Sequence, residues 1–115
     1  MHTPAHETDF TGAVERAMRI RTLYHELEQH HHGSPWTNQE DVLGLVHDVG
    51  ELGRLVMATE GRWVHQGDLH QDLEAKLAEC LWWILALSER LGIDLNRAFA
   101  AKMAELEISL VKGRV

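Results

Sequence analysis

Apolar residues recur at helical spacing in four stretches of the chain, at about 8–30, 37–59, 68–92 and 94–112. In each stretch the apolar side chains return every three or four positions, which places them on one face of a helix. No segment shows the regular alternation of apolar and polar residues that marks a half-buried strand. The pattern therefore predicts an all-α fold of four helices.

Residues with known helix-end preferences bound three of these stretches. Thr37 and Glu40 have the spacing of a capping box just before an apolar run. Gly92 is typical of the position just past a helix C-terminus, and Asp94 can cap the helix that follows. The connections between the first two helices and between the last two are short, which favours antiparallel neighbours. We therefore expect an antiparallel four-helix bundle over residues 1–115, as a single domain.

The third helix is apolar on nearly every side between Leu77 and Leu87, where Glu79 is the exception. A helix with this profile is buried all round, and four helices of one chain barely surround one of their own number. We therefore expect the bundle to be completed by association into a homodimer or homotetramer. Within this helix an a/d seam with a 4-3-4-3-4 rhythm comprises Leu73, Leu77, Cys80, Ile84, Leu87 and Leu91.

The composition is that of an ordinary soluble domain, with 44% apolar and 25% charged residues. No apolar run approaches the roughly 20 residues of a membrane span, and the polar N-terminus lacks a signal-peptide core, so a cytoplasmic protein is expected. Cys80 is the one cysteine, which excludes an intrachain disulfide and a cysteine-based zinc site. The net charge of -7 argues against binding a nucleic acid polymer.

Three carboxylates on the second and third helices are candidate metal ligands. Asp48 and Glu51, in "GLVHDVGELGRLV", are three residues apart and share one helix face. Glu79 lies within the apolar third helix, where an unpaired charge is costly. In one interpretation, Asp48 and Glu51 lie on a solvent-exposed face, and Glu79 forms a buried ion pair with Arg54 or another cation. The other is an oxygen-ligand site suited to Mg²⁺ or Mn²⁺.

The second helix also contains Gly44, Gly50 and Gly53. Each glycine costs about 1 kcal/mol relative to alanine in a helix interior. Their presence indicates either close approach of another helix or space left for a ligand, and the sequence does not separate the two.

Two long segments together carry a family resemblance. "LGLVHDVGELGRLV" and "LEAKLAECLWWILALSERLGIDLNRAFAAKMAELE" resemble the MazG-like branch of the all-α nucleoside triphosphate pyrophosphohydrolases, over about residues 35–107. That family has an acidic pair on one helix and a second acidic pair on the next. The resemblance implies an antiparallel helical fold that assembles as a dimer or tetramer. It also implies Mg²⁺-dependent hydrolysis of a (d)NTP, with water attacking the α-phosphorus, to a nucleoside monophosphate and pyrophosphate.

The resemblance assigns roles to residues of this chain by position. Asp48, Glu51 and Glu79 match metal ligands, with Glu51 and Glu79 in the catalytic centre, and Lys102 matches a lysine that reaches phosphate. Trp36 and Trp83 match positions where relatives place aromatic residues near the base. From residue type alone, Arg54 and Arg62 are candidate phosphate contacts, although Arg54, one turn past Glu51, can equally form a helical salt bridge with it. Trp63 is a candidate to stack on a base or to anchor its own loop.

Two positions depart from the family pattern. Lys76 stands where the family has the first acid of its second pair, and Leu106 stands where several relatives have an asparagine that contacts the nucleotide. Asp72, Lys76 and Glu79 would form an acid-base-acid ladder, in which Lys76 can neutralise Glu79 without metal. The alternative to an active hydrolase is therefore a catalytically weak or inactive relative that binds nucleotide or serves as an oligomeric interaction module. A helical bundle with buried ion pairs and no ligand is a third interpretation.

The histidines offer a further set of candidate ligands. His30–His32 precede "GSP", where a solvated chain end competes with transition-metal binding. His47 is next to Asp48 and is a candidate to orient a ligand or act as a base. Neither a phosphate-binding P-loop nor a serine-nucleophile motif is present.

Overall fold

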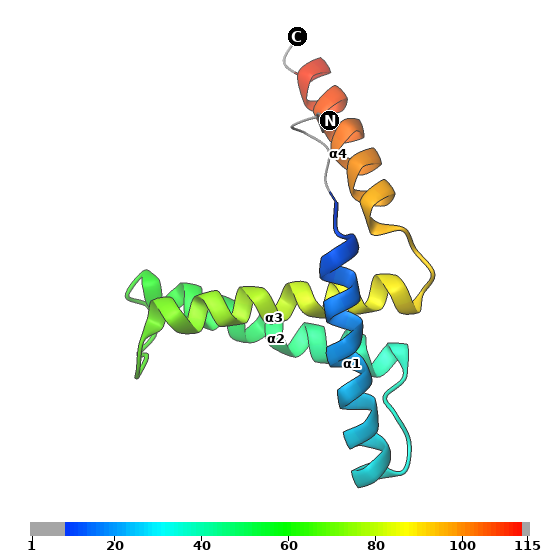
Figure 1. Ribbon diagram of the computed structural model, residues 1–115. Coiled ribbons are helices and arrows are strands. Elements are labelled where there is room, and N and C mark those ends of the chain that lie inside the picture. The colour runs from blue at the N-terminus through cyan, green and yellow to red at the C-terminus, as the bar shows by residue number, and fades with distance from the viewer. Residues whose placement is uncertain (1–8, 114–115) are drawn as a thin grey trace.

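The computed structural model describes residues 9–113, which form helices and connecting segments without a strand. The four helices are α1 (Thr11–His32), α2 (Asn38–Thr59), α3 (Leu69–Arg90) and α4 (Leu95–Lys112) (Figure 1). The predicted all-α class is confirmed, and the predicted helix ranges agree closely with these bounds. The predicted start of the first helix, at about residue 8, lies outside the described residues.

The predicted helix caps are confirmed. The Thr37 side chain accepts a hydrogen bond from the Glu40 backbone N–H at 3.2 Å, and the Glu40 side chain accepts one from Thr37 N–H at 2.9 Å. Asp94 caps α4, as predicted, by accepting a hydrogen bond from a backbone N–H group in the first turn, and the structure shows that Asp68 caps α3 in the same way. Gly92 has φ +68°, a left-handed conformation that side chains disfavour, and this turn separates α3 from α4.

Helix α3 is the centre of the packing. Helices α2 and α3 lie side by side and antiparallel, joined by the 60–68 loop, and α1 crosses α3 at a steep angle (Figure 1). The prediction that α1 and α2, and α3 and α4, are packed neighbours is wrong within one chain. The reason is that α3 is apolar on two faces, so it binds α2 with one face and α1 with the other.

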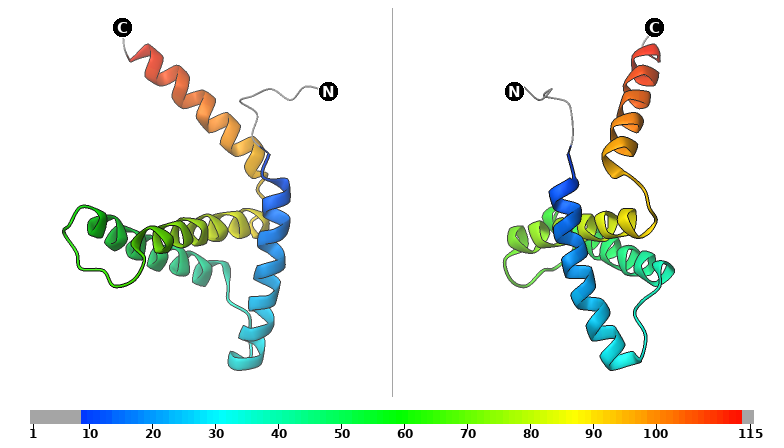
Figure 2. Two further views of the ribbon diagram at one scale, coloured as in Figure 1. Left: turned by 60° about the vertical axis from the view of Figure 1, so that its left-hand side comes forward. Right: turned by 45° about the vertical axis from the view of Figure 1, so that its right-hand side comes forward.

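Helix α4 extends away from the other three helices (Figure 2). It has no buried residue, and it is tied to the rest only near its start. Phe99 packs edge-to-face on Phe10 with ring centroids 5.5 Å apart, and the Asn96 side-chain amide donates a hydrogen bond to the Thr11 hydroxyl. The radius of gyration is 17.7 Å, against about 13 Å for a compact chain of this length. The four helices therefore do not close into a bundle within a single chain.

The buried apolar core is small, and the predicted seam of α3 is divided. Cys80 and Leu87 are buried, whereas Leu77, Ile84 and Leu91 are exposed by 56%, 42% and 55%. Within one chain α3 is therefore not buried all round, and its full burial by a second copy stays a prediction. The remaining buried apolar residues are Ala17, Leu55, Leu85 and Ala86. None of the helices in the described part of the chain is long and apolar enough to cross a membrane.

Candidate functional site

A cavity of about 670 Å³ lies where α1 faces α2 and α3. Its walls include four aromatic side chains, Tyr24, Trp36, Trp82 and Trp83, and we call it the tryptophan pocket. Asp48 and Glu79 also line it. The structure thus brings together four of the residues that the sequence singled out, namely Trp36, Asp48, Glu79 and Trp83.

The aromatic rings of the pocket form a continuous wall. Trp36 and Trp83 are nearly parallel, with an interplanar angle of 11° and ring centroids 6.4 Å apart. Trp83 also contacts Trp82, with centroids 4.6 Å apart, and Trp82 contacts Tyr24 at 5.5 Å. Flat, parallel aromatic surfaces favour stacking with a planar ligand.

Gly44 makes room for Trp83 on the surface of α2. A Cβ atom at Gly44 would lie 2.6 Å from Cζ2 of Trp83, closer than real contacts allow. At Gly50 and Gly53 the same atom would meet nothing within 4 Å. The sequence left open whether these glycines allow close approach of a helix or leave space for a ligand. For Gly44 the structure shows the former, because this glycine permits close approach of α3.

Lys76 bridges the two carboxylates that face each other from α2 and α3. Its Nζ lies 3.1 Å from Asp48 Oδ1 and 3.1 Å from Glu79 Oε2. The second oxygen of Asp48 accepts a hydrogen bond from the Trp83 indole N–H at 2.7 Å. Both Asp48 oxygens are therefore occupied, and the ammonium group of Lys76 lies where one cation can contact both helices.

These contacts shift the pKa of both partners. Burial opposes the charge on Asp48, but the bonds from Trp83 and Lys76 outweigh it, so the pKa of Asp48 lies below its ordinary value. Burial also opposes the charge on Lys76, and the bonds to Glu79 and Asp48 outweigh it, so the pKa of Lys76 is raised. The bridge therefore holds Asp48 as an anion and Lys76 as a cation at neutral pH.

Glu51 does not join this bridge. Its carboxylate accepts a hydrogen bond from Arg54 at 2.9 Å, one turn along α2. Among residues 9–113 there is no group of three or more histidine, cysteine or acidic side chains that could hold a metal ion. Two of the three predicted ligands, Asp48 and Glu79, therefore contact Lys76. The third, Glu51, is bound to Arg54.

A buried ionic cluster, which the sequence analysis did not identify, lies next to the pocket. Arg21, on α1, is 1% exposed and donates to Asp41 Oδ1 at 2.9 Å and Oδ2 at 3.0 Å, and Asp41 is fully buried. Arg21 also donates to Glu28, and Arg90 of α3 donates to Asp41. These four residues, from α1, α2 and α3, join the three helices by charge-assisted hydrogen bonds.

The ionic cluster also positions Trp36. Glu28 accepts a hydrogen bond from the Trp36 backbone N–H at 2.7 Å, and Arg90 donates to the Trp36 carbonyl at 3.0 Å. The backbone N–H and carbonyl of Trp36 are therefore both hydrogen-bonded, and this fixes the loop between α1 and α2. A signal for this existed in the sequence, because Ala17, Arg21, Tyr24 and Glu28 follow a 4-3-4 spacing that places two charges on the apolar face of α1.

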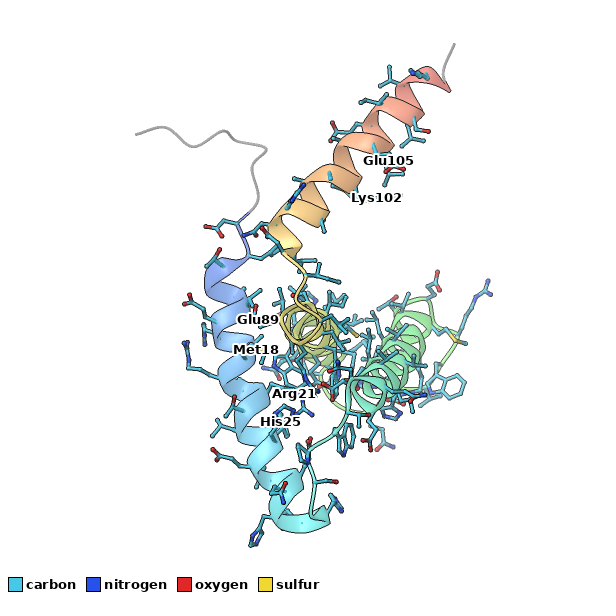
Figure 3. All side chains as sticks on the ribbon, turned by 90° about the vertical axis from the view of Figure 1, so that its right-hand side faces the viewer. Met18, Arg21, His25, Glu89, Lys102 and Glu105 are labelled. Atoms are coloured by element: carbon cyan, nitrogen blue, oxygen red, sulfur yellow. The ribbon has the colours of Figure 1, made fainter. Side chains whose placement is uncertain are left out.

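Other predicted site residues lie outside the tryptophan pocket in this chain. Lys102 is on α4, where it pairs with Glu105 at 3.2 Å and is 58% exposed (Figure 3). Trp63 is 50% exposed and lines, with Arg62, a separate shallow hollow in the loop between α2 and α3. Leu106 is on α4 and is also exposed. A larger hollow of about 1150 Å³ between α1 and the start of α4 is lined by none of the predicted site residues.

One pair of the predicted ladder on α3, Lys76 with Glu79, is confirmed, whereas Asp72 bonds to a different residue. Asp72 pairs with His65 at 2.7 Å, so Lys76 reaches across to Asp48 on α2 in its place. His30–His32 form the last turn of α1 and are exposed, and His31 and His32 reach the mouth of the tryptophan pocket. His47 is exposed on α2, next to Asp48.

No protein-family model, curated protein or solved structure matches the chain. The proposals below therefore rest on the residues and contacts described above and on the motifs quoted from the sequence.

Proposed function

We propose that this chain is a MazG-like helical domain that binds the base of a nucleotide in the tryptophan pocket, with Lys76 in the place of a metal ion. One observation carries the proposal. The parallel rings of Trp36 and Trp83 lie beside the Asp48–Lys76–Glu79 bridge. Catalysis of phosphate-ester hydrolysis by this chain is then weak or absent.

The pocket suits a planar aromatic group. Its volume, about 670 Å³, falls within the roughly 300–1,000 Å³ of typical small-molecule sites. Stacking of a base on an aromatic side chain contributes about 1–3 kcal/mol. The two aromatic residues that the family resemblance assigns to the base, Trp36 and Trp83, are the two that stack here.

The electrostatics of the pocket disfavour a triphosphate without metal. Lys76 and Arg21 are the basic groups nearest to its acids, and each is bound to two carboxylates. A phosphate chain would have to draw Lys76 from Asp48 and Glu79, leaving two carboxylates close together. We therefore assign the binding energy to the base and the bridging role to Lys76.

An active Mg²⁺- or Mn²⁺-dependent (d)NTP pyrophosphohydrolase is the second candidate. The observation that favours it is that Asp48 and Glu79, on facing helices, both contact one cation, the Lys76 ammonium. In that function Asp48, Glu51 and Glu79 would hold the metal ion once Lys76 and Arg54 had turned away from them. A phosphate contact by Lys102 would require α4 to lie closer to the pocket than it does in this chain. Water would then attack the α-phosphorus and break its bond to the bridging oxygen, so that pyrophosphate leaves and a nucleoside monophosphate remains.

Calorimetry distinguishes these functions from a ligand-free structural bundle. Nucleosides, nucleoside monophosphates and (d)NTPs are titrated into the protein with and without Mg²⁺. We expect binding without Mg²⁺ that Trp36→Ala weakens at least tenfold, the loss of about 1.4 kcal/mol, whereas Trp63→Ala, outside the pocket, leaves it unchanged. No binding of any of these compounds would exclude both nucleotide functions.

Pyrophosphate release separates the two nucleotide functions. We expect none above background from the natural protein with Mg²⁺ or Mn²⁺. Release that Glu79→Gln and Asp48→Asn abolish would establish the hydrolase and overturn the assignment of Lys76 as a permanent occupant of the site.

We also propose that the chain forms a homodimer or homotetramer in the cytoplasm. The observation that supports self-association is the exposure of apolar side chains on all four helices. Apolar patches of this extent mark interaction surfaces.

A further inference from the structure

Helix α2 is apolar on the face that it turns away from α3. Taking 100° per residue, nine residues between Val42 and Met57 lie within about 80° of Val46 around the helix. One of these, Arg54 at the edge of the face, pairs with Glu51, and the other eight are uncharged. Six of them are large apolar residues, which are between 39% and 62% exposed. Asp48 and Leu55, on the opposite side, are buried. We call this set the outer face of α2: Val42, Leu43, Val46, Val49, Gly50, Gly53, Val56 and Met57.

The two glycines of the outer face have no role within the chain. Gly44, on the inner side of α2, is needed because Trp83 lies against it. Gly50 and Gly53 face open space, although glycine is unfavourable in a helix interior. Glycine on an exposed helix surface allows another backbone to approach closely.

The exposed area of the chain corresponds to an unpartnered subunit. The accessible surface is 8886 Å², against about 6,400 Å² for a folded monomer of 13.1 kDa. The excess, about 2,500 Å² for one chain, exceeds the roughly 800 Å² per partner of a standard interface, and both the extended α4 and the outer face of α2 contribute to it. This surplus argues for a permanent partner.

We infer that the outer face of α2 packs antiparallel against the outer face of α2 in a second copy of this chain. In this arrangement the two-fold axis passes between Val49 and Gly50, so that each of these residues meets its own copy. Val46 enters the space over Gly53 of the partner helix. At the ends, Val42 lies opposite Val56, and Leu43 lies opposite Met57.

The pattern is self-complementary, which is what a two-fold interface requires. Every large side chain of the outer face meets either a glycine or another apolar side chain. In a parallel pairing Val46 would meet Val46 of the partner helix, and the two side chains would crowd each other. Gly53 would then meet Gly53, which would leave a void. The antiparallel pairing also places the N-terminus of each α2 helix beside the C-terminus of the other, so that the two helix dipoles attract each other. These features favour a second copy over an unrelated protein, and the interface does not depend on the ligand proposed above.

The mass in solution and a reciprocal exchange of side chains test the interface. Sedimentation equilibrium should give twice the 13.1 kDa chain mass, or four times if dimers pair. Val46→Gly and Gly53→Val should each weaken dimerisation about tenfold or more, through a void and through overpacking. The double variant restores the knob and hole in exchanged positions and should recover much of the affinity. Circular dichroism confirms that each variant stays helical.

Disulfide formation tests the register in a Cys80→Ala background. Val49→Cys should cross-link two chains on oxidation, because residue 49 lies at the axis. Val42→Cys should not, because its two copies would be roughly 22 Å apart at 1.5 Å per residue. A chain that remains monomeric up to millimolar concentration would overturn the proposal. Cross-linking through Val42→Cys, or a double variant weaker than both single variants, would overturn it equally.

Discussion

Lys76 on α3 and Asp48 on α2 form an ion pair of 3.1 Å that joins the two helices at the wall of the tryptophan pocket. The same ammonium group contacts Glu79 at 3.1 Å. In a metal-dependent site, a divalent cation would hold carboxylates from two helices in this way. Here a covalently attached cation does so, and this decides how the site responds to metal, to mutation and to pH.

Replacing Lys76 with an acid should convert the bridge into a metal site. Without metal, Lys76→Glu should lower the free energy of unfolding by about 2 kcal/mol, because charge-assisted hydrogen bonds are lost and three carboxylates adjoin. Millimolar Mg²⁺ should restore stability to this variant, since binding to the native state stabilises it. Thermal unfolding with and without Mg²⁺ measures both effects.

Lys102→Glu is the matched control for this experiment. Lys102 also pairs with a glutamate three residues later, but it is exposed on α4. We expect a change within about 0.5 kcal/mol and no response to Mg²⁺. If Mg²⁺ stabilised both variants equally, the site assignment of Lys76 would be wrong.

Gly44→Ala should destabilise the fold although alanine favours helices. The added Cβ would lie 2.6 Å from Trp83, so the indole must move, at a cost of about 1–3 kcal/mol. Gly12→Ala in α1, where nothing lies within 4 Å of the added atom, should be neutral or stabilising by up to about 1 kcal/mol. Urea unfolding compares the two, and equal stability would show that Trp83 is not held against α2.

Asp41→Asn should be among the most destabilising conservative changes in the chain. Asp41 is fully buried between Arg21 and Arg90, so the change removes the anion that these two guanidinium groups share and leaves Arg21 paired with Glu28. Breaking such a pair costs about 3–5 kcal/mol. Glu105→Gln, which disrupts an exposed pair on α4, should cost less than about 1 kcal/mol. Chemical denaturation of both variants tests whether the ionic cluster joins the three helices.

Stability should fall below about pH 6.5 in part because of His25. Burial, followed by the nearby Arg21 and Arg90, lowers the pKa of His25, although Glu28 and Asp41 partly oppose this. The folded state therefore binds fewer protons than the unfolded state, so the contribution of His25 is complete above the unfolded pKa and is lost as the pH falls.

His25→Gln should reduce this loss of stability between pH 7.5 and 5.5, because glutamine does not titrate. His70→Gln is the control, since His70 is 85% exposed and pairs only with Glu74. Unfolding free energies at the two pH values measure the difference. A pH dependence that His25→Gln leaves unchanged would show that another group is responsible.

Much of the local structure was predictable from the sequence because it depends on near neighbours. Helical periodicity located all four helices, and the predicted caps at Thr37 and Asp94 depend on residues within three positions. The pairing of Glu51 with Arg54 followed for the same reason. The presence of Gly44, Gly50 and Gly53 indicated either close approach of another helix or space for a ligand, and only the structure showed that Gly44 lies against Trp83.

Sequence alone determined that the chain is helical, where the helices end, that carboxylates occur on α2 and α3, and that two tryptophans occur on α3. The tertiary structure decided which of these groups meet, because that depends on how α1 crosses α3 and how α2 lies along it. It placed Lys76 between Asp48 and Glu79, set Trp36 against Trp83, and left Lys102 distant on α4. Spacing along one helix specifies a face, whereas a site formed from three helices depends on packing between residues far apart in the chain.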